Sequence, residues 1–350
     1  MKSLYESLLD DTQLKVSSAK KKLKSIPSEI KAFLKENYKG TFKVSKEPND
    51  DGFYLVTARK DVELTNKAAT SLTNGLFIFD EVWGDFFCGH SKITSLDGAP
   101  ERVNGSFQCR KCQELETLEG GPKYVSEHYD ASFCNNLKSL VGGPIEVGKS
   151  LDVFNCSSLE TLKGAPKRIG LTFNALGCEN LKKFETETEV VGVSFIANDC
   201  PNLTSIKGSP KLVKGDFNIK NCTKLTSLVG SPKQVGRYMC SGCVKVQSLK
   251  GMSQDSYPVN RDGYLECNGT SITSLEGIPQ SMEEVNCVDC VNLTTLKGCP
   301  KKIDILDCRG CVNLSDIDDI PDKMHYLCIT GTNIDIEHAK EICTFTGGVE

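Results

Sequence analysis

The stretch from Asn202 to Cys243 reads NLTSIKGSPKLVKGDFNIKNCTKLTSLVGSPKQVGRYMCSGC, and its pattern recurs through most of the chain. A leucine pair, a Gly-x-Pro, a valine, a phenylalanine and a cysteine follow one another, and then the series begins again. A fixed period of about 20 to 50 residues is typical of a solenoid, in which each repeat buries its apolar face only against its neighbours. The stretch therefore predicts a repeat architecture.

The period is regular in both halves of the chain. The early prolines of the pattern lie 22 residues apart, except for one gap of 44, and the last three lie 21 residues apart. In the middle of the long gap, Thr188 stands in a copy that lacks the Gly-x-Pro. The prolines are Pro100, Pro122, Pro144, Pro166, Pro210, Pro232, Pro279, Pro300 and Pro321.

Each repeat contains two segments that we expect to be extended. In the V-x-G-x-F part, apolar residues alternate as in a strand with one buried face, for example at Val213, Gly215 and Phe217. In the L-x-x-L-x-G-x-P part, we expect a turn to lead into a second short strand that glycine and proline end. The recurring Gly-x-Pro argues against helices. The fold class predicted is a mainly β solenoid with a 21–22-residue period.

We expect three parts in the chain. Residues 1–60 do not repeat, and they predict a short helix over residues 3–11, a second helix starting near Ser28 and an antiparallel hairpin over TFKVS and GFYLVTA. This α+β cap is expected to include Trp83. Residues 61–330 form the solenoid, in whose atypical first repeat Val62 matches Phe86. Residues 331–350 predict a short C-terminal capping helix, with Asp335 as its N-cap and Ile336 on its apolar face.

Composition and charge give no sign of a membrane or nucleic-acid partner. The 350 residues carry a formal net charge of -4, and a strongly basic chain would be expected for either partner. No apolar run approaches the roughly 18 residues of a membrane span, and MKSLYESLLDD lacks the apolar core of a signal peptide. We therefore expect a soluble protein made in the cytosol.

The chain contains 18 cysteines, and many recur at fixed places in the repeat. Because cysteine is small and often buried, we expect stacked, reduced thiols. Cys287, Cys290, Cys308 and Cys311 form C-x2-C-x17-C-x2-C, which matches a structural zinc site. The repeat itself produces this spacing, so we expect no metal and no cofactor, with zinc at these four cysteines as the alternative.

Other recurring polar residues have structural interpretations. Serine or threonine precedes the second leucine of most copies, as Ser95 and Thr117 do, and we expect each hydroxyl to complete the local turn. Lysines after the prolines, with the Lys20–Lys24 run, suggest a basic ridge, but Glu101 and Glu189 interrupt it and interleaved aromatic residues are missing. Nucleic-acid binding through this ridge is the alternative function. The lysines of the ridge are Lys123, Lys167, Lys211, Lys233, Lys301, Lys302 and Lys323.

The repeat resembles the BspA-like class of leucine-rich repeats, whose units run L-x-x-I-x-(L/G)-P-x-x-V-x-x-I-x-x-x-A-F-x-x-C. The resemblance covers about 260 residues, and the chain departs from it in using G-x-P. The opening MKSLYESLLDD, the segments IKAFLKENYKGTFKVS and SLTNGLF, and the T-S-L-x-G-x-P repeats are also similar to proteins encoded by tailed phages of gut bacteria, including crAss-like phages. The resemblances imply a leucine-rich-repeat-like solenoid of phage origin.

No catalytic pattern is present, because the four histidines are scattered and the acidic residues do not recur in pairs. We therefore expect a non-enzymatic protein-interaction or structural module, acting on a host protein in the host cytoplasm or incorporated in the virion. The largest break in the period runs from Gly251 to Gly263. Since loops on rigid scaffolds often bind partners, its Met252, Tyr257 and Arg261 are the expected contact residues.

Overall fold

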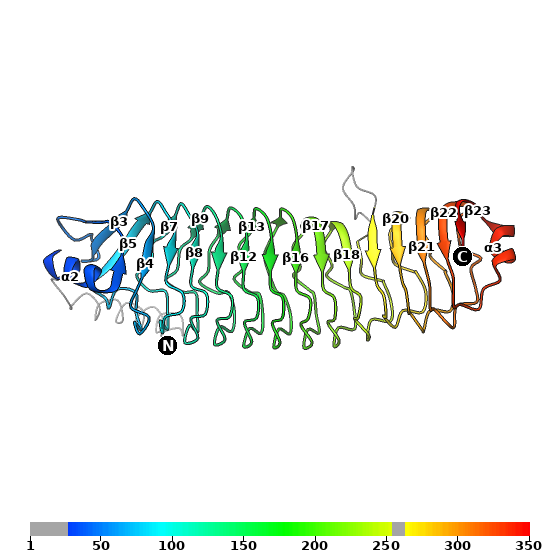
Figure 1. Ribbon diagram of the computed structural model, residues 1–350, viewed down its shortest axis with the longest axis horizontal. Coiled ribbons are helices and arrows are strands. Elements are labelled where there is room, and N and C mark those ends of the chain that lie inside the picture. The colour runs from blue at the N-terminus through cyan, green and yellow to red at the C-terminus, as the bar shows by residue number, and fades with distance from the viewer. Residues whose placement is uncertain (1–26, 254–262) are drawn as a thin grey trace, which may run out of the picture.

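The computed structural model describes residues 27–253 and 263–350, and these form one elongated coil of stacked rungs (Figure 1). Each rung is one repeat of the sequence, and there are about 13 turns in the described residues. All the strands of this part of the chain belong to one sheet. The prediction of a mainly β solenoid with a 21–22-residue period is confirmed.

Two parallel ladders of short strands run along the rungs of the N-terminal half, each strand pairing with its counterpart one rung away. The first ladder consists of β3 (Tyr54–Ala58), β5 (Phe77–Val82), β7 (Arg102–Val103), β9 (Tyr124–Val125), β11 (Glu146–Val147), β13 (Arg168–Ile169) and β15 (Val190–Val191). The second ladder consists of β4 (Val62–Leu64), β6 (Phe86–Phe87), β8 (Phe107–Gln108), β10 (Tyr129–Asp130), β12 (Leu151–Asp152), β14 (Phe173–Asn174) and β16 (Phe195–Ile196).

The two ladders merge at β17 (Leu212–Asn218), which pairs with both β15 and β16. The sequence explains the change, because the two buried strand residues are four apart at Val213 and Phe217 but three apart at Val235 and Tyr238. A register shift between β17 and β18 absorbs the difference. The later strands are β18 (Gln234–Met239), β19 (Tyr264–Glu266), β20 (Ser281–Asn286), β21 (Lys302–Asp307) and β22 (Lys323–Cys328).

The L-x-x-L part of the repeat is not the strand that the sequence predicted. Its leucines are buried, but only isolated bridges occur there, such as Thr161 with Lys183. The hydroxyl prediction is confirmed instead: each Ser or Thr before the second leucine accepts a hydrogen bond from the N–H two residues ahead, at 3.1 to 3.5 Å. These bonds fold the segment into a turn, because they draw the backbone away from the extended conformation.

The N-terminal end consists of α2 (Pro27–Asn37), β1 (Tyr38–Lys39) and the hairpin of β2 (Phe42–Val44) with β3. The predicted hairpin is antiparallel, as expected, and β3 also pairs in parallel with β5, so the hairpin opens the first ladder. Val62 pairs with Phe86, as the sequence alignment of the first repeat predicts. Trp83, however, is 59% exposed and does not cover the apolar end.

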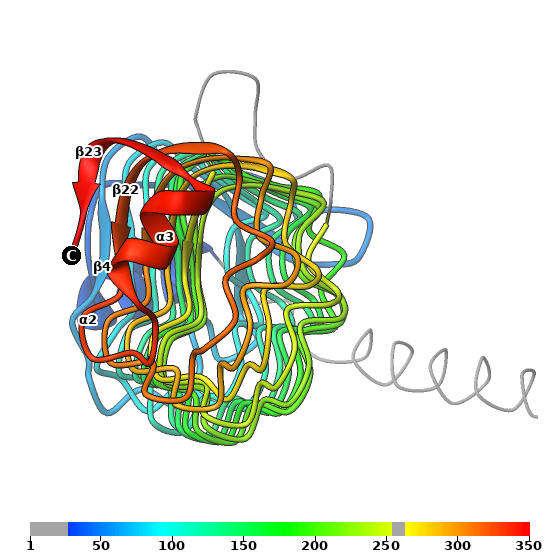
Figure 2. The ribbon, with the colours of Figure 1, turned by 90° about the vertical axis from the view of Figure 1, so that its right-hand side faces the viewer.

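The C-terminal end carries α3 (Ile336–Ile342), which lies across the last rung (Figure 2). Asp335 caps it by accepting the N–H of Glu337 at 3.0 Å, as predicted. Ala339 is buried, whereas Ile336 is 38% exposed and does not belong to the buried face. The chain then forms β23 (Thr344–Val349), which pairs in parallel with β22. This strand was not predicted, because its residues do not follow the repeat pattern.

All 18 cysteines are buried and free, as predicted. Nine of them form what we call the thiol ladder, in which each Sγ donates to a backbone carbonyl of the preceding rung at 3.1 to 3.4 Å. The hydroxyls of Ser91, Thr270 and Thr332, at the equivalent position, donate within their own rung at 2.6 to 2.8 Å. Cysteine therefore ties successive rungs together as well as filling space. The nine are Cys112, Cys134, Cys156, Cys178, Cys200, Cys222, Cys243, Cys290 and Cys311.

Alkaline pH should destabilise the fold through this ladder. Burial raises the pKa of Cys200 to about 12 and that of Cys112 to about 11, while an unfolded thiol titrates near about 8.5. The stabilisation is therefore fully present below about pH 8.5 and is lost as the pH rises toward the folded-state pKa values. Urea unfolding between about pH 7 and pH 10 should show the decline, and Cys200→Ala should make it shallower. A flat profile would contradict the protonated, buried ladder.

Candidate functional site

The residue that precedes each thiol-ladder position, or its Ser or Thr equivalent, has a left-handed backbone. In the twelve described rungs from His90 to Gly331, its φ lies between 54° and 77°. Nine of these residues are glycine, asparagine or aspartate, which adopt this conformation readily. The nine are Asn155, Gly177, Asp199, Asn221, Gly242, Gly269, Asp289, Gly310 and Gly331.

Three successive rungs at the N-terminal end break this rule, because they place His90, Lys111 and Phe133 in the left-handed position. A residue with a bulky side chain costs about 1 to 2 kcal/mol in this conformation. Such strain is found where the surrounding structure imposes it, and it is concentrated at functional sites. The three rungs therefore mark the surface that most needs an explanation beyond folding.

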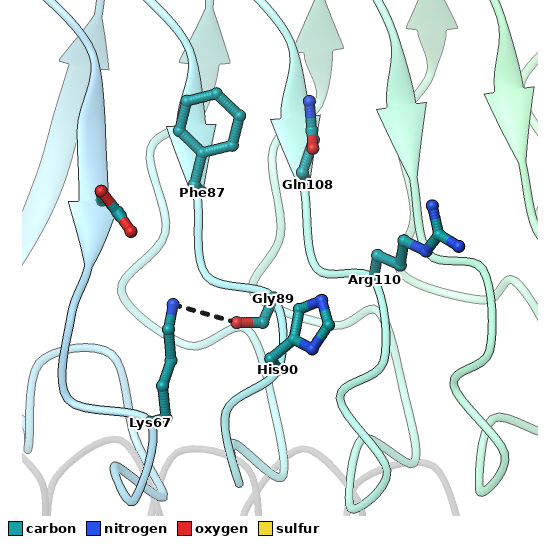
Figure 3. Close-up of a pocket in the computed structure, with 7 residues that line it drawn as sticks. Lys67, Phe87, Gly89, His90, Gln108 and Arg110 are labelled. Atoms are coloured by element: carbon teal, nitrogen blue, oxygen red, sulfur yellow. Dashed lines mark hydrogen bonds between the residues drawn. The ribbon is translucent and has the colours of Figure 1, made fainter.

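The first of these side chains lines a shallow pocket of about 350 Å3, which we call the cationic pocket. Lys67, His90 and Arg110 line it below the strand ends that carry Phe87 and Gln108, and the Arg110 side chain points away from Lys67 and His90 (Figure 3). The Lys67 ammonium donates to the carbonyls of Leu64 at 2.6 Å and Gly89 at 3.2 Å, which holds it at the pocket rim. The lining residues are Glu63, Lys67, Phe87, Gly89, His90, Gln108 and Arg110.

Arg110 connects the cationic pocket to two half-buried rings, Phe133 and Phe154, which we call the aromatic step. Its guanidinium lies 5.1 Å from the Phe133 centroid and 5.7 Å from the Phe154 centroid. The Lys111 ammonium lies 5.7 Å from the Phe133 centroid, and the two rings meet edge to face at 5.1 Å. The Nε of Arg110 is buried and has no hydrogen-bond partner among the described residues. The side chains of three rungs thus form one continuous surface.

The charges of this surface are unbalanced. Its four basic residues form no ion pair within the described residues; they are Lys67, His90, Arg110 and Lys111. Glu63 is the one carboxylate in the pocket lining.

Carboxylates border this surface on the second ladder. Asp130 and Asp152 pair in register across β10 and β12. Burial raises the pKa of Asp152, and the Asp130 carboxylate adds to the shift, while a hydrogen bond from Asn174 and the nearby His128 and Arg110 oppose it. The cationic surface therefore ends at an acidic border.

Of the three contact residues that the sequence suggested, the structure describes Met252. Met252 is 5% exposed and belongs to the apolar core, so it is not available to a partner. The insertion was expected to display it, but its backbone N–H still bonds to the Leu249 carbonyl at 3.3 Å, as in a regular rung. Tyr257 and Arg261 lie outside the described residues.

The lysines after the prolines do not form an uninterrupted basic surface. The Lys123 ammonium donates to the Gly142 carbonyl at 2.9 Å, and Lys211 pairs with Glu189 at 3.4 Å. The expected helix over residues 3–11 and the Lys20–Lys24 run lie outside the described residues. Nothing in this row favours nucleic-acid binding.

The four cysteines with zinc-like spacing are arranged as two thiol columns. The Cys287 and Cys308 sulfurs lie 3.4 Å apart, while Cys290 and Cys311 donate to the carbonyls of Cys267 and Cys287. In the described part of the chain, no group of three or more histidine, cysteine, aspartate or glutamate side chains is placed to hold a metal ion.

Comparisons with known proteins give no further assignment. No family model matches the chain, and no curated protein matches it. Across residues 27–253 and 263–350, neither helix has the length and apolar character needed to cross a bilayer.

Sequence reasoning missed the cationic pocket, although a signal was present. His90 was interpreted, with the other scattered histidines, as a surface or cap residue, and Lys111 and Phe133 were not singled out. The residue before the repeating cysteine is Asn, Asp or Gly in most copies, so His, Lys and Phe in three consecutive copies are an anomaly that alignment of the repeats reveals. Its meaning depends on the left-handed backbone, which the sequence alone did not indicate.

Proposed function

We propose that the protein is a non-enzymatic, phage-encoded interaction module that binds a protein partner through the cationic pocket and the aromatic step. The observation that carries the proposal is the strained column: His90, Lys111 and Phe133 occupy left-handed positions that glycine, asparagine or aspartate fill elsewhere. A requirement for folding alone would favour Asn or Gly at these positions. Display of side chains to a partner explains the choice.

The composition of the surface agrees with a protein partner. Aromatic residues and arginine are enriched at the centres of protein interfaces, where they account for most of the binding energy. Repeat proteins also supply extended surfaces for binding. The phage origin, and action in the host cytoplasm or in the virion, come from the sequence resemblance and complete the proposal.

The test separates binding from folding with the triple variant H90N/K111N/F133N. Asparagine tolerates the left-handed backbone, so relief of strain should offset the lost ring contacts and the melting temperature should not fall. Affinity capture from extracts of phage-infected bacteria, followed by mass spectrometry, should recover a defined partner with the wild type. The triple variant should recover at least about tenfold less of it, equivalent to about 1.4 kcal/mol.

The matched control is N155D/D199N/D289N, which changes the same column in other rungs and should capture as much partner as the wild type. Equal capture by the first triple variant would refute the proposal. A melting temperature several degrees lower in that variant would mean that the three side chains serve folding, and would also count against it.

A further inference from the structure

The chemistry of the cationic pocket defines the kind of segment that fits it. Lys67, His90 and Arg110 line a pocket whose lining contains one carboxylate, Glu63. The buried Nε of Arg110 has no hydrogen-bond partner among the described residues. Guanidinium groups bind carboxylates with paired, charge-assisted hydrogen bonds. A carboxylate is therefore the complementary group.

The neighbouring aromatic step indicates that the bound segment carries an apolar side chain beside that carboxylate. Phe133 and Phe154 are only partly covered by the rest of the protein, and Phe87 borders the pocket on its other side. Apolar area that stays partly exposed and is rimmed by polar residues is typical of a protein interface.

Two features argue against nucleic acid as the occupant. Asp130 and Asp152 lie in adjacent strands near Arg110, so a phosphate backbone, with a negative charge at every nucleotide, would be repelled more strongly than a single carboxylate that reaches Arg110. The ring of Phe133 already holds the cations of Arg110 and Lys111, whereas binding of single strands depends on open ring faces for base stacking.

We infer that the cationic pocket and the aromatic step bind a protein segment in which an aspartate or glutamate stands next to a leucine or an aromatic residue. This inference rests on the proposed function and specifies the partner's chemistry. Arg110 holds the carboxylate, with His90 and Lys67 beside it. The parts of Phe133 and Phe154 that stay exposed beside these cations contact the apolar side chain.

The test uses the full chain and an array of short synthetic peptides that contain Glu-Leu, Asp-Leu, Glu-Phe or Asp-Phe. Matched peptides carry glutamine or asparagine in place of the acid, and an oligodeoxythymidylate serves as the nucleic-acid probe. Fluorescence anisotropy should show binding of the acidic peptides, at least about tenfold weaker binding of their amide counterparts and weakening by salt. Arg110→Gln should lose at least about tenfold in affinity, whereas Arg168→Gln, an exposed arginine on the first ladder, should lose none.

Each outcome decides between the alternatives. Equal binding of acidic and amide peptides, tighter binding of the oligonucleotide, or an unaffected R110Q variant would overturn the inference. If no peptide binds but the wild type still captures a partner that H90N/K111N/F133N loses, the partner chemistry is wrong and the proposed function stands. If neither experiment shows binding, both fail.

Discussion

Replacing Phe195 by alanine should lower the free energy of unfolding by about 3 to 5 kcal/mol, which is the usual cost of deleting a buried ring. Phe195 is fully buried. Its ring meets Phe173 and Phe184 edge to face at 5.1 and 5.0 Å and stacks on Phe217 at 5.3 Å. The loss affects three rungs at once, because the Phe195 ring contacts rings of the rungs on both sides. A solenoid has no other core in which the remaining rings could pack.

Urea unfolding followed by circular dichroism measures this effect. Leu171→Ala is the control, since Leu171 is 40% exposed and its removal should cost no more than about 0.5 kcal/mol. A loss below about 1 kcal/mol for Phe195→Ala would mean that the neighbouring rings close the cavity, contrary to the tightly packed column described above.

A second large effect is expected from adding one methyl group to Gly170. A Cβ at this position would lie 1.8 Å from the carbonyl oxygen of Gly148, one rung away. Gly170 is not in the left-handed region, so the cost comes from space alone. The oxygen belongs to the backbone and the Cβ is fixed directly to it, so the two atoms can separate only if the rungs move apart. We expect Gly170→Ala to destabilise the fold by about 3 kcal/mol or more.

Asp304 provides the matched control for this substitution. It follows the buried residue Ile303, as Gly170 follows Ile169, but it lies in a 21-residue rung that accommodates a side chain. Asp304→Ala should therefore change stability by no more than about 0.5 kcal/mol in thermal or urea unfolding. A similar melting temperature for Gly170→Ala and the wild type would show that the spacing between rungs is adjustable.

The sequence predicted the features that come from local patterns and from equivalent residues of successive repeats packing against one another. The valine, phenylalanine and cysteine columns, the capping role of Asp335 and the turn hydroxyls all follow from local patterns repeated in register. Features that depend on a change between neighbours were missed. The ladders merge because one residue disappears between Val213–Phe217 and Val235–Tyr238, and a single-repeat consensus does not contain that information.

The candidate site was harder to predict than the fold for a physical reason. We expected function at the largest irregularity in length, from Gly251 to Gly263. The strained column instead keeps the normal length and changes only side chains, at His90, Lys111 and Phe133. Recognising it requires the backbone conformation of the position, which distinguishes an ordinary polar turn from one that holds bulky residues against their preference.

The thiol ladder has a consequence for how the stack opens. A ladder cysteine ties its rung to the one before it, but the hydroxyl of Thr270 donates within its own rung and otherwise contacts only the Cys290 sulfur of the following rung. The hydrogen bonds from ladder thiols to the preceding rung therefore stop after Cys243 and resume at Cys290. The stability of a solenoid is approximately a sum of the interactions within each rung and between neighbouring rungs. Local unfolding therefore starts at the junction where these interactions are weakest. We therefore expect the rungs up to Met252 and those from Gly263 onward to unfold as two cooperative blocks, with exchange of buried amides beginning at the seam between them.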